Sequence, residues 1–527
     1  MPPEEKKEIQ ARPRATLTGK TAQAMLWFLL FCLIAGFRTD PRQLVASLRF
    51  EPTQGVSWYS SSPSVAEQPV VSPEEKSETA PVVKADLNEA AKLLGIDPKA
   101  EDLLGDVRRI EDPTGRAMSS FYEALTRTVH REPGAVTRIL HYGDSLVVVD
   151  FLTGETRRRL QGRFGDAGHG FMMAGKPWPW YQHWDVTYRT GSWTVDGIMN
   201  PKSREGYYGL GGFAFDGSGP SQFVEYGTQQ KSEYGRRASR FEVYYLIRPG
   251  GGSFDVYADD VLQTKVKTAG PIIKSGVYTV KVKDGAHKFR VQCAGDGPVR
   301  LFGGVLEREG PGLVYDTLGI NGGRARTLER INTALWAEQL RLRRPDLVIL
   351  NFGTNESEDE DRPMAVVETD YGNILRTIRA AVPEASCLVM SPADRAARLN
   401  GKLTTKTIIP RLVATQRRAA LKAGCAFYDT YQAMGGHGSM ARWYENKPRL
   451  CAGDMTHPNR LGADLLGGGL YRSFVTGLIE YAGLTMQAKA AGAPLPVPTE
   501  PLTLYAPLWP AQPEWHPPLP EQPRLPF

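Results

Sequence analysis

Short apolar runs alternate with amphipathic stretches in two separate parts of the chain, residues 101–186 and 312–490. In the first part, helical patterns over 117–129 and 154–164 flank a strand-like run over 136–140. Strands that alternate with helices along a sequence form a parallel sheet with helices on both faces. The two parts therefore predict one three-layer α/β/α domain. In the second part the expected strands are 347–350, 386–390 and 426–429, and the expected helices are 371–381 and 410–423.

The residues between these parts, 187–311, have a different period. Apolar and polar residues alternate one by one in short segments, separated by turns rich in Gly and Asp. Several such segments in succession predict a β-sandwich or jelly roll. An all-β domain is thus expected to interrupt the α/β domain. Its expected strands are 184–188, 241–247, 253–257, 277–282, 287–292 and 299–302.

The two ends of the chain show neither period. Within residues 1–37, an apolar segment over 24–37 follows a basic flank, which is typical of a signal peptide or signal anchor. We expect an uncleaved membrane anchor with the rest of the chain exported; a cleaved signal and a buried helix are the alternatives. Residues 38–100 predict a linker. The Pro-rich residues 491–527 predict a tail, either a strap on the domain, a polyproline ligand or a disordered extension.

Length and charge limit the classes of function. A chain of 527 residues is too long for one core. Its net charge of +6 is spread without a Lys/Arg stripe interleaved with aromatic residues, which argues against a nucleic-acid partner. The histidines His141, His183 and His437 lack ligand spacing with carboxylates, so we expect neither a metal site nor a cofactor.

The five cysteines contain no Cys-x-x-Cys pair, so neither a zinc knuckle nor a redox motif is expected. Cys387 and Cys425 fall near strand-like runs, and we expect them to be buried as small apolar residues. For Cys451, a disulfide to Cys425 and a free thiol near Asp454 are both open.

Two short motifs far apart in the chain carry the chemistry of a nucleophile. Ser145, in His-Tyr-Gly-Asp-Ser, follows the strand-like run over 136–140, and Asp454 precedes His457 by three residues. A serine hydroxyl is a weak nucleophile near neutral pH and needs a base within hydrogen-bond reach and a group that orients the base. His457 and Asp454 can supply both from one short segment.

Two further motifs lie between these ends, Gly319-Ile-Asn-Gly322 and Gly353-Thr-Asn355. The resulting order of Ser, Gly, Asn and Asp-x-x-His resembles that of the SGNH (GDSL-type) hydrolase superfamily. Part of the pattern departs from the family, because apolar residues follow the serine and Glu356 follows the asparagine.

This resemblance implies a role for each motif. Ser145 is the nucleophile, His457 the base, and Asp454 the residue that orients it. The amides of Ser145 and Gly322 and the side chain of Asn355 form the oxyanion hole. Gly319 and Gly323 are the alternatives to Gly322 as the second donor.

The β-domain inserted after the serine motif adds a closer resemblance, to peptidoglycan O-acetylesterases of the same superfamily. It implies an exported serine esterase that removes O-acetyl groups from a cell-envelope carbohydrate such as peptidoglycan, without a cofactor. The expected location is the periplasm or another extracytoplasmic space, with the N-terminal segment in the inner membrane. A carbohydrate O-acyltransferase with the same triad and a non-catalytic carbohydrate-binding protein are the alternatives.

Three more residues are candidates for substrate binding. Trp178 and Trp180, in Trp-Pro-Trp, can stack on sugar rings, and packing in the core is the alternative interpretation. His169 belongs to the Gly-rich segment 163–171 and can reach the site from the loop after the helix over 154–164. Its alternative role is to order a tight turn.

Overall fold

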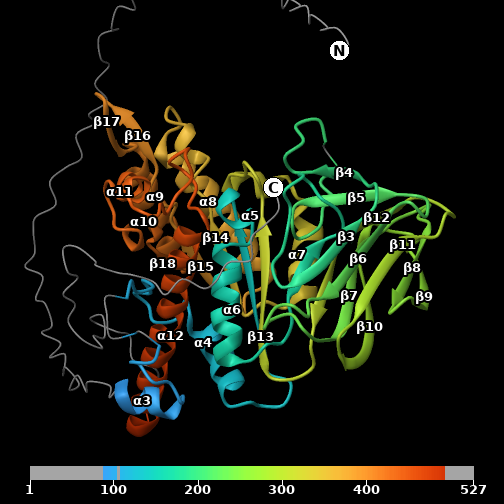
Figure 1. Ribbon diagram of the computed structural model, residues 1–527, viewed down its shortest axis with the longest axis horizontal. Coiled ribbons are helices and arrows are strands. Elements are labelled where there is room, and N and C mark those ends of the chain that lie inside the picture. Colours follow the sequence, from blue (N-terminus) through green and yellow to red (C-terminus); the bar gives the residue numbers. More distant parts are fainter. Residues whose placement is uncertain (1–86, 102, 104–106, 204, 493–527) are drawn as a thin grey trace, which may run out of the picture. The chain divides into compact units, whose positions relative to one another are not determined.

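The computed structural model describes residues 87–101, 103, 107–203 and 205–492 (Figure 1). The expected anchor over 24–37 and almost all of the expected tail lie outside these residues. Within the described ranges, no helix combines the length and apolar character needed to cross a bilayer.

A five-stranded parallel sheet, the central sheet, forms the middle layer of the α/β domain. Its strand order is β13-β1-β14-β15-β18. Gly143 at the end of β1 pairs with Gly319 of β13 and with Asn351 of β14, so three neighbouring strands end at the same level. The bounds are β1 (Val136–Gly143), β13 (Gly312–Gly319), β14 (Leu347–Asn351), β15 (Ser386–Met390) and β18 (Ala426–Tyr428).

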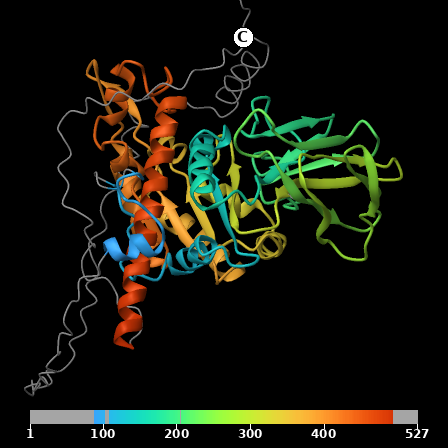
Figure 2. The same ribbon diagram turned by 60° about the horizontal axis from the view of Figure 1, so that its bottom comes forward.

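Helices cover both faces of the central sheet. Along β1 the side chains alternate, so that Ile139 lies in one core and Leu140 in the other. The core of Ile139 also contains residues of α4 (Ser119–Val129), α6 (Leu152–Phe164) and α12 (Arg460–Ala491). The core of Leu140 contains residues of α7 (Thr333–Arg343), α8 (Met364–Ala381) and α9 (Ile408–Lys422). The expected three-layer α/β/α fold is confirmed, and Figure 2 shows α12 running alongside α6.

Two antiparallel sheets form the inserted domain, as expected from its period of two. One has the order β10-β7-β12-β5-β4, with β2 also paired to β12, and the other has the order β3-β6-β11-β8-β9. The bounds are β2 (Gly170–Met173), β3 (Val186–Thr190), β4 (Thr194–Gly197), β5 (Phe213–Gly217), β6 (Phe223–Thr228), β7 (Ala238–Ile247), β8 (Ser253–Ala258), β9 (Val261–Lys267), β10 (Lys274–Gly285), β11 (Lys288–Cys293) and β12 (Val299–Glu307).

Two boundaries differ from those expected. β2 lies before residue 187 yet pairs with β12 of the sandwich. The sequence did not reveal this strand, because its four residues are all buried and show no alternation of polar and apolar positions. The helix α3 (Leu87–Leu93) falls inside the range expected to be a linker. It packs against α12 with Ala90 and Ala91 buried, so the folded part begins before residue 100.

Several short elements complete the α/β domain. They connect the strands of the central sheet or cover its ends. They are α5 (Ser145–Val148), α10 (Thr430–Ala433), α11 (Ser439–Glu445), the 3-10 helices η1 (Ala325–Arg330) and η2 (Glu356–Glu358), and the hairpin of β16 (Ala396–Leu399) with β17 (Lys402–Thr405).

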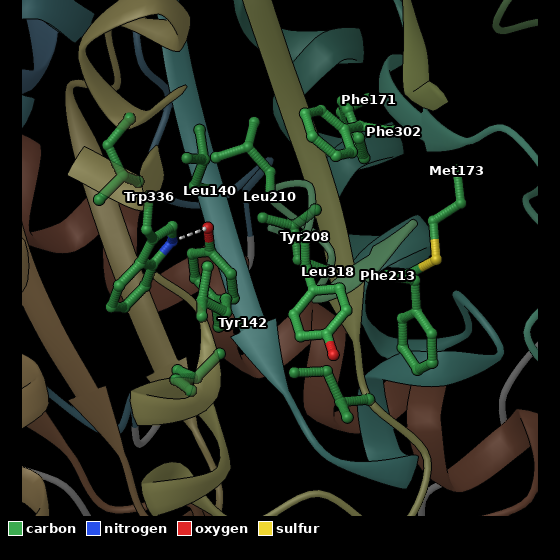
Figure 3. Packing of buried hydrophobic residues seen from close by; sticks show 14 of the residues in the cluster. Leu140, Tyr142, Phe171, Met173, Tyr208, Leu210, Phe213, Phe302, Leu318 and Trp336 are labelled. Carbon is green, nitrogen blue, oxygen red and sulfur yellow. Dashed lines mark hydrogen bonds between the residues drawn. The ribbon is translucent and has the colours of Figure 1, made fainter. Parts of the chain in front are cut away.

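The sandwich and the α/β domain share one continuous core. Figure 3 shows Leu140 and Tyr142 of β1 in the same cluster as Phe302 of β12 and other sandwich residues. On the α/β side, Trp336 of α7 donates from its indole N–H to the hydroxyl of Tyr142 at 3.1 Å. The inserted domain is therefore packed on the catalytic domain through buried side chains.

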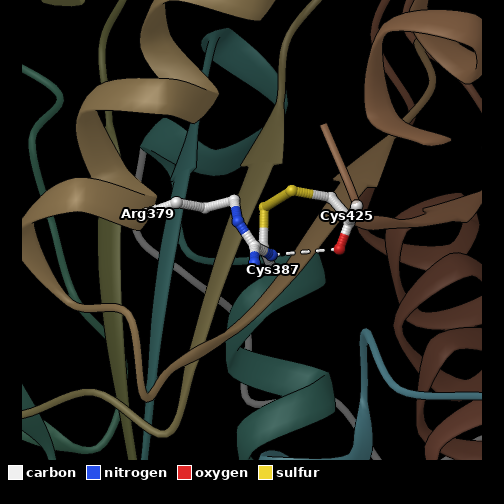
Figure 4. Close-up of a disulfide and its surroundings, with 4 residues drawn as sticks. Arg379, Cys387 and Cys425 are labelled. Carbon is white, nitrogen blue, oxygen red and sulfur yellow. Dashed lines mark hydrogen bonds between the residues drawn. A yellow bond between two sulfur atoms is a disulfide. The ribbon is translucent and has the colours of Figure 1, made fainter. Parts of the chain in front are cut away.

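One disulfide ties β15 to the residue just before β18. Cys387 and Cys425 are joined (Figure 4) and both are buried, as expected, but the sequence had left open only a pairing of Cys425 with Cys451. Next to it, Arg379 donates a hydrogen bond to the carbonyl of Gly424 at 3.0 Å. Cys451 is a buried free thiol, so the second of its two alternatives applies.

Candidate active site

Ser145 lies at the turn between β1 and α5, at the C-terminal end of the central sheet. Asp144 caps the helix, and its carboxylate accepts a hydrogen bond from the Leu146 amide at 3.1 Å. Gly143 makes the turn possible, because a Cβ there would lie 2.3 Å from a methyl group of Val147. The turn leaves Ser145 half-buried, with its hydroxyl free to face the loops from other strands.

His457 and Asp454 lie opposite this serine. The Ser145 Oγ is 2.7 Å from His457 Nε2, and His457 Nδ1 is 2.6 Å from Asp454 Oδ2. The other carboxylate oxygen of Asp454 accepts hydrogen bonds from the amides of Thr456 and His457. Burial alone would raise the pKa of Asp454, but the hydrogen bonds from His457 and Thr456 outweigh it and hold the pKa below its ordinary value. The three side chains thus form one hydrogen-bonded series.

The expected oxyanion donors come from the loops after β1, β13 and β14. The amides of Ser145 and Gly322 donate to no acceptor in the part of the chain that the structure describes. Asn355 donates from Nδ2 to the carbonyl of Gly323 at 2.9 Å, which holds its side chain against the Gly322 loop. The amide of Gly323 is committed to the Ile320 carbonyl. Gly322, with a φ of +73°, is thus a donor with a free amide.

Gly319, the other alternative to Gly322, has a structural reason to be glycine. It lies inside β13, and a Cβ there would meet the backbone amide of Val148 at 2.5 Å. This glycine therefore lets α5 pack closely against the central sheet.

A cavity of about 300 Å³ opens beside Ser145 and His457. Trp180 lines it with 53% of its surface exposed, and Asn321 lies at its edge. Sequence reasoning did not single out Asn321, although it stands directly before Gly322. The remaining wall is mostly apolar and consists of Leu146, Val148, Val149, Phe151, Leu152, Pro458 and Ala463.

Two of the expected substrate-binding residues lie elsewhere. Trp178 is buried and packs edge-on against Tyr181 and Phe213, so the packing interpretation applies to it. His169 is also buried, and its Nε2 lies 3.0 Å from Nδ1 of His183. Neither residue lines the cavity, so we no longer assign substrate contacts to them.

His169, His183 and Asp150 bring their ligand atoms within 4.8 Å of one another, which is close enough to hold a metal ion. The Asp150 carboxylate, however, accepts two hydrogen bonds from the guanidinium of Arg157, at 2.9 and 2.8 Å, and a third from Thr317. A buried arginine thus already supplies the positive charge. Burial lowers the pKa of His183 to about 4, against the pull of Asp150. The donor set fits a buried ion-pair network better than a metal site.

Comparisons with known proteins bear on the family and the fold. Residues 281–465 match the family model of the GDSL-like lipase/acylhydrolase family. The match begins after Ser145, so the place of the serine in the family pattern rests on the structure. Comparison with curated protein sequences finds no match.

Solved structures show a similar fold. One described as "Peptidoglycan O-acetylesterase in action, 5 min" has a TM-score of 0.59 and 22% identity, and the alignment covers 69% of this chain and 98% of that one. A salicylyl-acyltransferase from a tetracycline biosynthetic pathway covers 58% of this chain and 96% of its own at 14% identity, but its TM-score of 0.28 is too low to carry an argument. Residues 281–465 thus belong to a GDSL-like lipase/acylhydrolase domain, the domain type expected from the order of the four motifs. The fold of the chain resembles that of the O-acetylesterase.

Proposed function

We propose that this protein is a serine esterase that removes O-acetyl groups from a carbohydrate of the cell envelope, most specifically peptidoglycan. The observation that carries the proposal is the hydrogen-bonded series from Ser145 through His457 to Asp454, beside a cavity open to substrate. The likeness of the fold to a peptidoglycan O-acetylesterase, together with the inserted β-sandwich, supports the choice of polymer. Export and an inner-membrane anchor at residues 24–37 are part of the same proposal.

The mechanism follows from the positions of the side chains. Ser145 Oγ attacks the ester carbonyl while its proton passes to His457 Nε2, and Asp454 stabilises the imidazolium that forms. The negative charge on the carbonyl oxygen is met by the free amides of Ser145 and Gly322 and by Asn355. His457 then gives this proton to the sugar oxygen of the ester as the C–O bond breaks, so that the sugar leaves as its alcohol. Water attacks the acetyl-serine by the same route and releases acetate.

Acetate release tests this proposal. The described residues from 87 to 492 belong to one compact unit, so a protein that spans residues 81–527 includes α3. We expect this protein to release acetate from O-acetylated peptidoglycan faster than from O-acetylated xylan, and Ser145→Ala to release none above background. Equal release by Ser145→Ala would contradict the serine mechanism. Transfer of acetyl to an added chito-oligosaccharide, without hydrolysis, would identify an acyltransferase. No activity in either assay would identify a carbohydrate-binding protein.

Trp180 gives a second prediction, for substrate binding. Its exposed ring lines the cavity, so it is placed to stack on a sugar. We expect Trp180→Ala to raise KM for the polymer about tenfold, or ~1.4 kcal/mol, with little change in kcat. KM for a small ester such as 4-nitrophenyl acetate should not change, and Trp180→Phe should keep most of the affinity. An unchanged polymer KM in Trp180→Ala would rule out this contact.

A further inference from the structure

Two buried carboxyl groups lie behind the proposed oxyanion hole, and the proposed mechanism assigns neither of them a role. The first is Asp144, which is fully buried. One of its oxygens accepts a hydrogen bond from the Leu146 amide and the other from the Thr354 amide, each at 3.1 Å. Asp144 thereby ties the turn that carries Ser145 to the loop that carries Asn355.

The second is Glu356, which follows Asn355 and has 6% of its surface exposed. Its Oε1 accepts a hydrogen bond from the Ala325 amide at 2.8 Å. Its Oε2 is buried and has no hydrogen-bond partner among the described residues. Glu356 thereby ties the Asn355 loop to the turn that begins at Gly322.

Neighbouring contacts join the same two segments. Asn355 donates to the Gly323 carbonyl at 2.9 Å, and Arg324 forms two hydrogen bonds of 2.7 Å with Asp359. The Glu356 contact is the innermost of these because both of its partners are buried. The relative position of the Gly322 amide and the Asn355 side chain therefore depends on it.

We propose that Glu356 is a positioning residue of the esterase site, and that it holds the turn from Gly322 to Ala325 against the Asn355 loop. This inference rests on the proposed function, because it assigns Gly322 and Asn355 to one oxyanion hole. It adds a dependence on the charge of a residue outside the triad.

The surroundings of Glu356 make it harder to ionise than an exposed carboxyl group. Burial, reinforced by the nearby charge of Asp144 and opposed by the Ala325 amide, raises the pKa of Glu356 to about 7. Burial raises the pKa of Asp144 as well, against hydrogen bonds from the amides of Leu146 and Thr354 and the charge of His457. From the other side, α8 presents the phenol of Tyr371, whose hydroxyl accepts a hydrogen bond from Gln416 of α9.

The remaining charge near Glu356 is the guanidinium of Arg324, which lowers its pKa only weakly because Arg324 is paired with Asp359. Ionisation of Glu356 would therefore place a second negative charge beside Asp144. That charge would oppose the developing oxyanion. Activity should accordingly fall as the pH rises through about 7.

The pH profile of kcat tests this. For the wild type, we expect kcat to fall about tenfold between pH 7 and pH 9. Glu356→Gln keeps the oxygen that accepts from Ala325 but cannot ionise, so its kcat should stay level over that range. Glu356→Ala should lower kcat at least tenfold at every pH, with KM changed less than threefold. Glu360→Gln, at an exposed position of the same segment, is the control and should keep the wild-type profile.

A second readout is independent of activity. An acid whose pKa is higher in the folded state stabilises that state below its unfolded pKa and loses this contribution as the pH rises to the folded value. The melting temperature of Glu356→Gln should therefore rise relative to that of the wild type between about pH 4.5 and pH 7. The difference should then stay constant at higher pH.

The outcomes are separable. The inference would be overturned if kcat of Glu356→Gln fell between pH 7 and pH 9 as in the wild type and the two melting temperatures did not diverge. The esterase proposal would then remain intact. A wild type that releases no acyl group, with the difference in melting temperature present, would overturn the proposed function and with it the catalytic part of this inference. Full kcat in Glu356→Ala would also overturn it.

Discussion

Replacing His457 with alanine should lower kcat for ester hydrolysis by a factor on the order of 10⁶. The imidazole is 2.7 Å from the serine hydroxyl, and no other described residue hydrogen-bonds to that hydroxyl. Without this base, Ser145 keeps its proton and attacks the ester only slowly. Steady-state kinetics on a small activated ester would measure the loss, and KM should change little, because the effect falls on the chemical step.

Asp454→Ala should lower kcat less, by a factor of about 10⁴, since His457 still reaches Ser145 but loses its orienting partner. The double variant should have about the same kcat as His457→Ala alone, because the two groups act as one unit. His437→Ala is the matched control and should retain full activity, since this exposed histidine lies on the turn before α11. Activity of His457→Ala within tenfold of the wild type would show that another group serves as base.

The candidate site could be predicted from the sequence because several of its residues directly follow strand-like runs. Ser145 and Asn355 come shortly after strand-like runs, and parallel strands end at one edge of a sheet. The register then places the ends of β1, β13 and β14 at the same level. The spacing within Asp-x-x-His is short enough for one turn to hold both groups in contact. The strand ends and the short Asp-x-x-His spacing are therefore enough to predict that the three side chains of the triad come together.

Other features depend on packing that a periodic pattern does not reveal. Trp178 and Trp180 are two residues apart and chemically alike, yet one faces the core and the other the cavity, because the turn between them decides which way each ring points. β12 and β13 are buried at every position, so they show no alternation. The Cys387–Cys425 disulfide depends on how close β15 lies to β18.

The role of Glu356 could not be predicted from the sequence for a related reason. A glutamate after the asparagine of Gly-Thr-Asn gives no sign of burial, and its partner Ala325 is supplied by a loop 31 residues away. Only the structure shows that both partners are buried and that one carboxyl oxygen is left unpaired. Exposed carboxylates and buried ones look the same in a sequence, although their chemistry differs.

Replacing Arg343 with methionine should destabilise the fold by about 3–5 kcal/mol. Arg343 of α7 is buried, and its guanidinium meets Asp316 of β13 at 2.6 and 2.9 Å and Glu307 of β12 at 2.5 Å. Burial alone would raise the pKa of Glu307, but the charges of Arg343 and Arg138 lower it to about 2. Methionine fills the space yet leaves carboxylates in the core with too little positive charge, and urea unfolding would measure the loss.

The pH dependence and a control separate this cause from lost packing. The deficit of Arg343→Met should shrink as the pH falls from 7 to 4, because the stranded carboxyls can then take up protons. Arg341→Met, on the exposed side of the same helix, should change stability by less than about 0.5 kcal/mol. A deficit independent of pH would mean that the guanidinium matters only for packing. Because Glu307 belongs to the sandwich and Asp316 to the central sheet, activity in Arg343→Met should be lost at the same urea concentration as the fold, so that the inserted domain and the catalytic site unfold together.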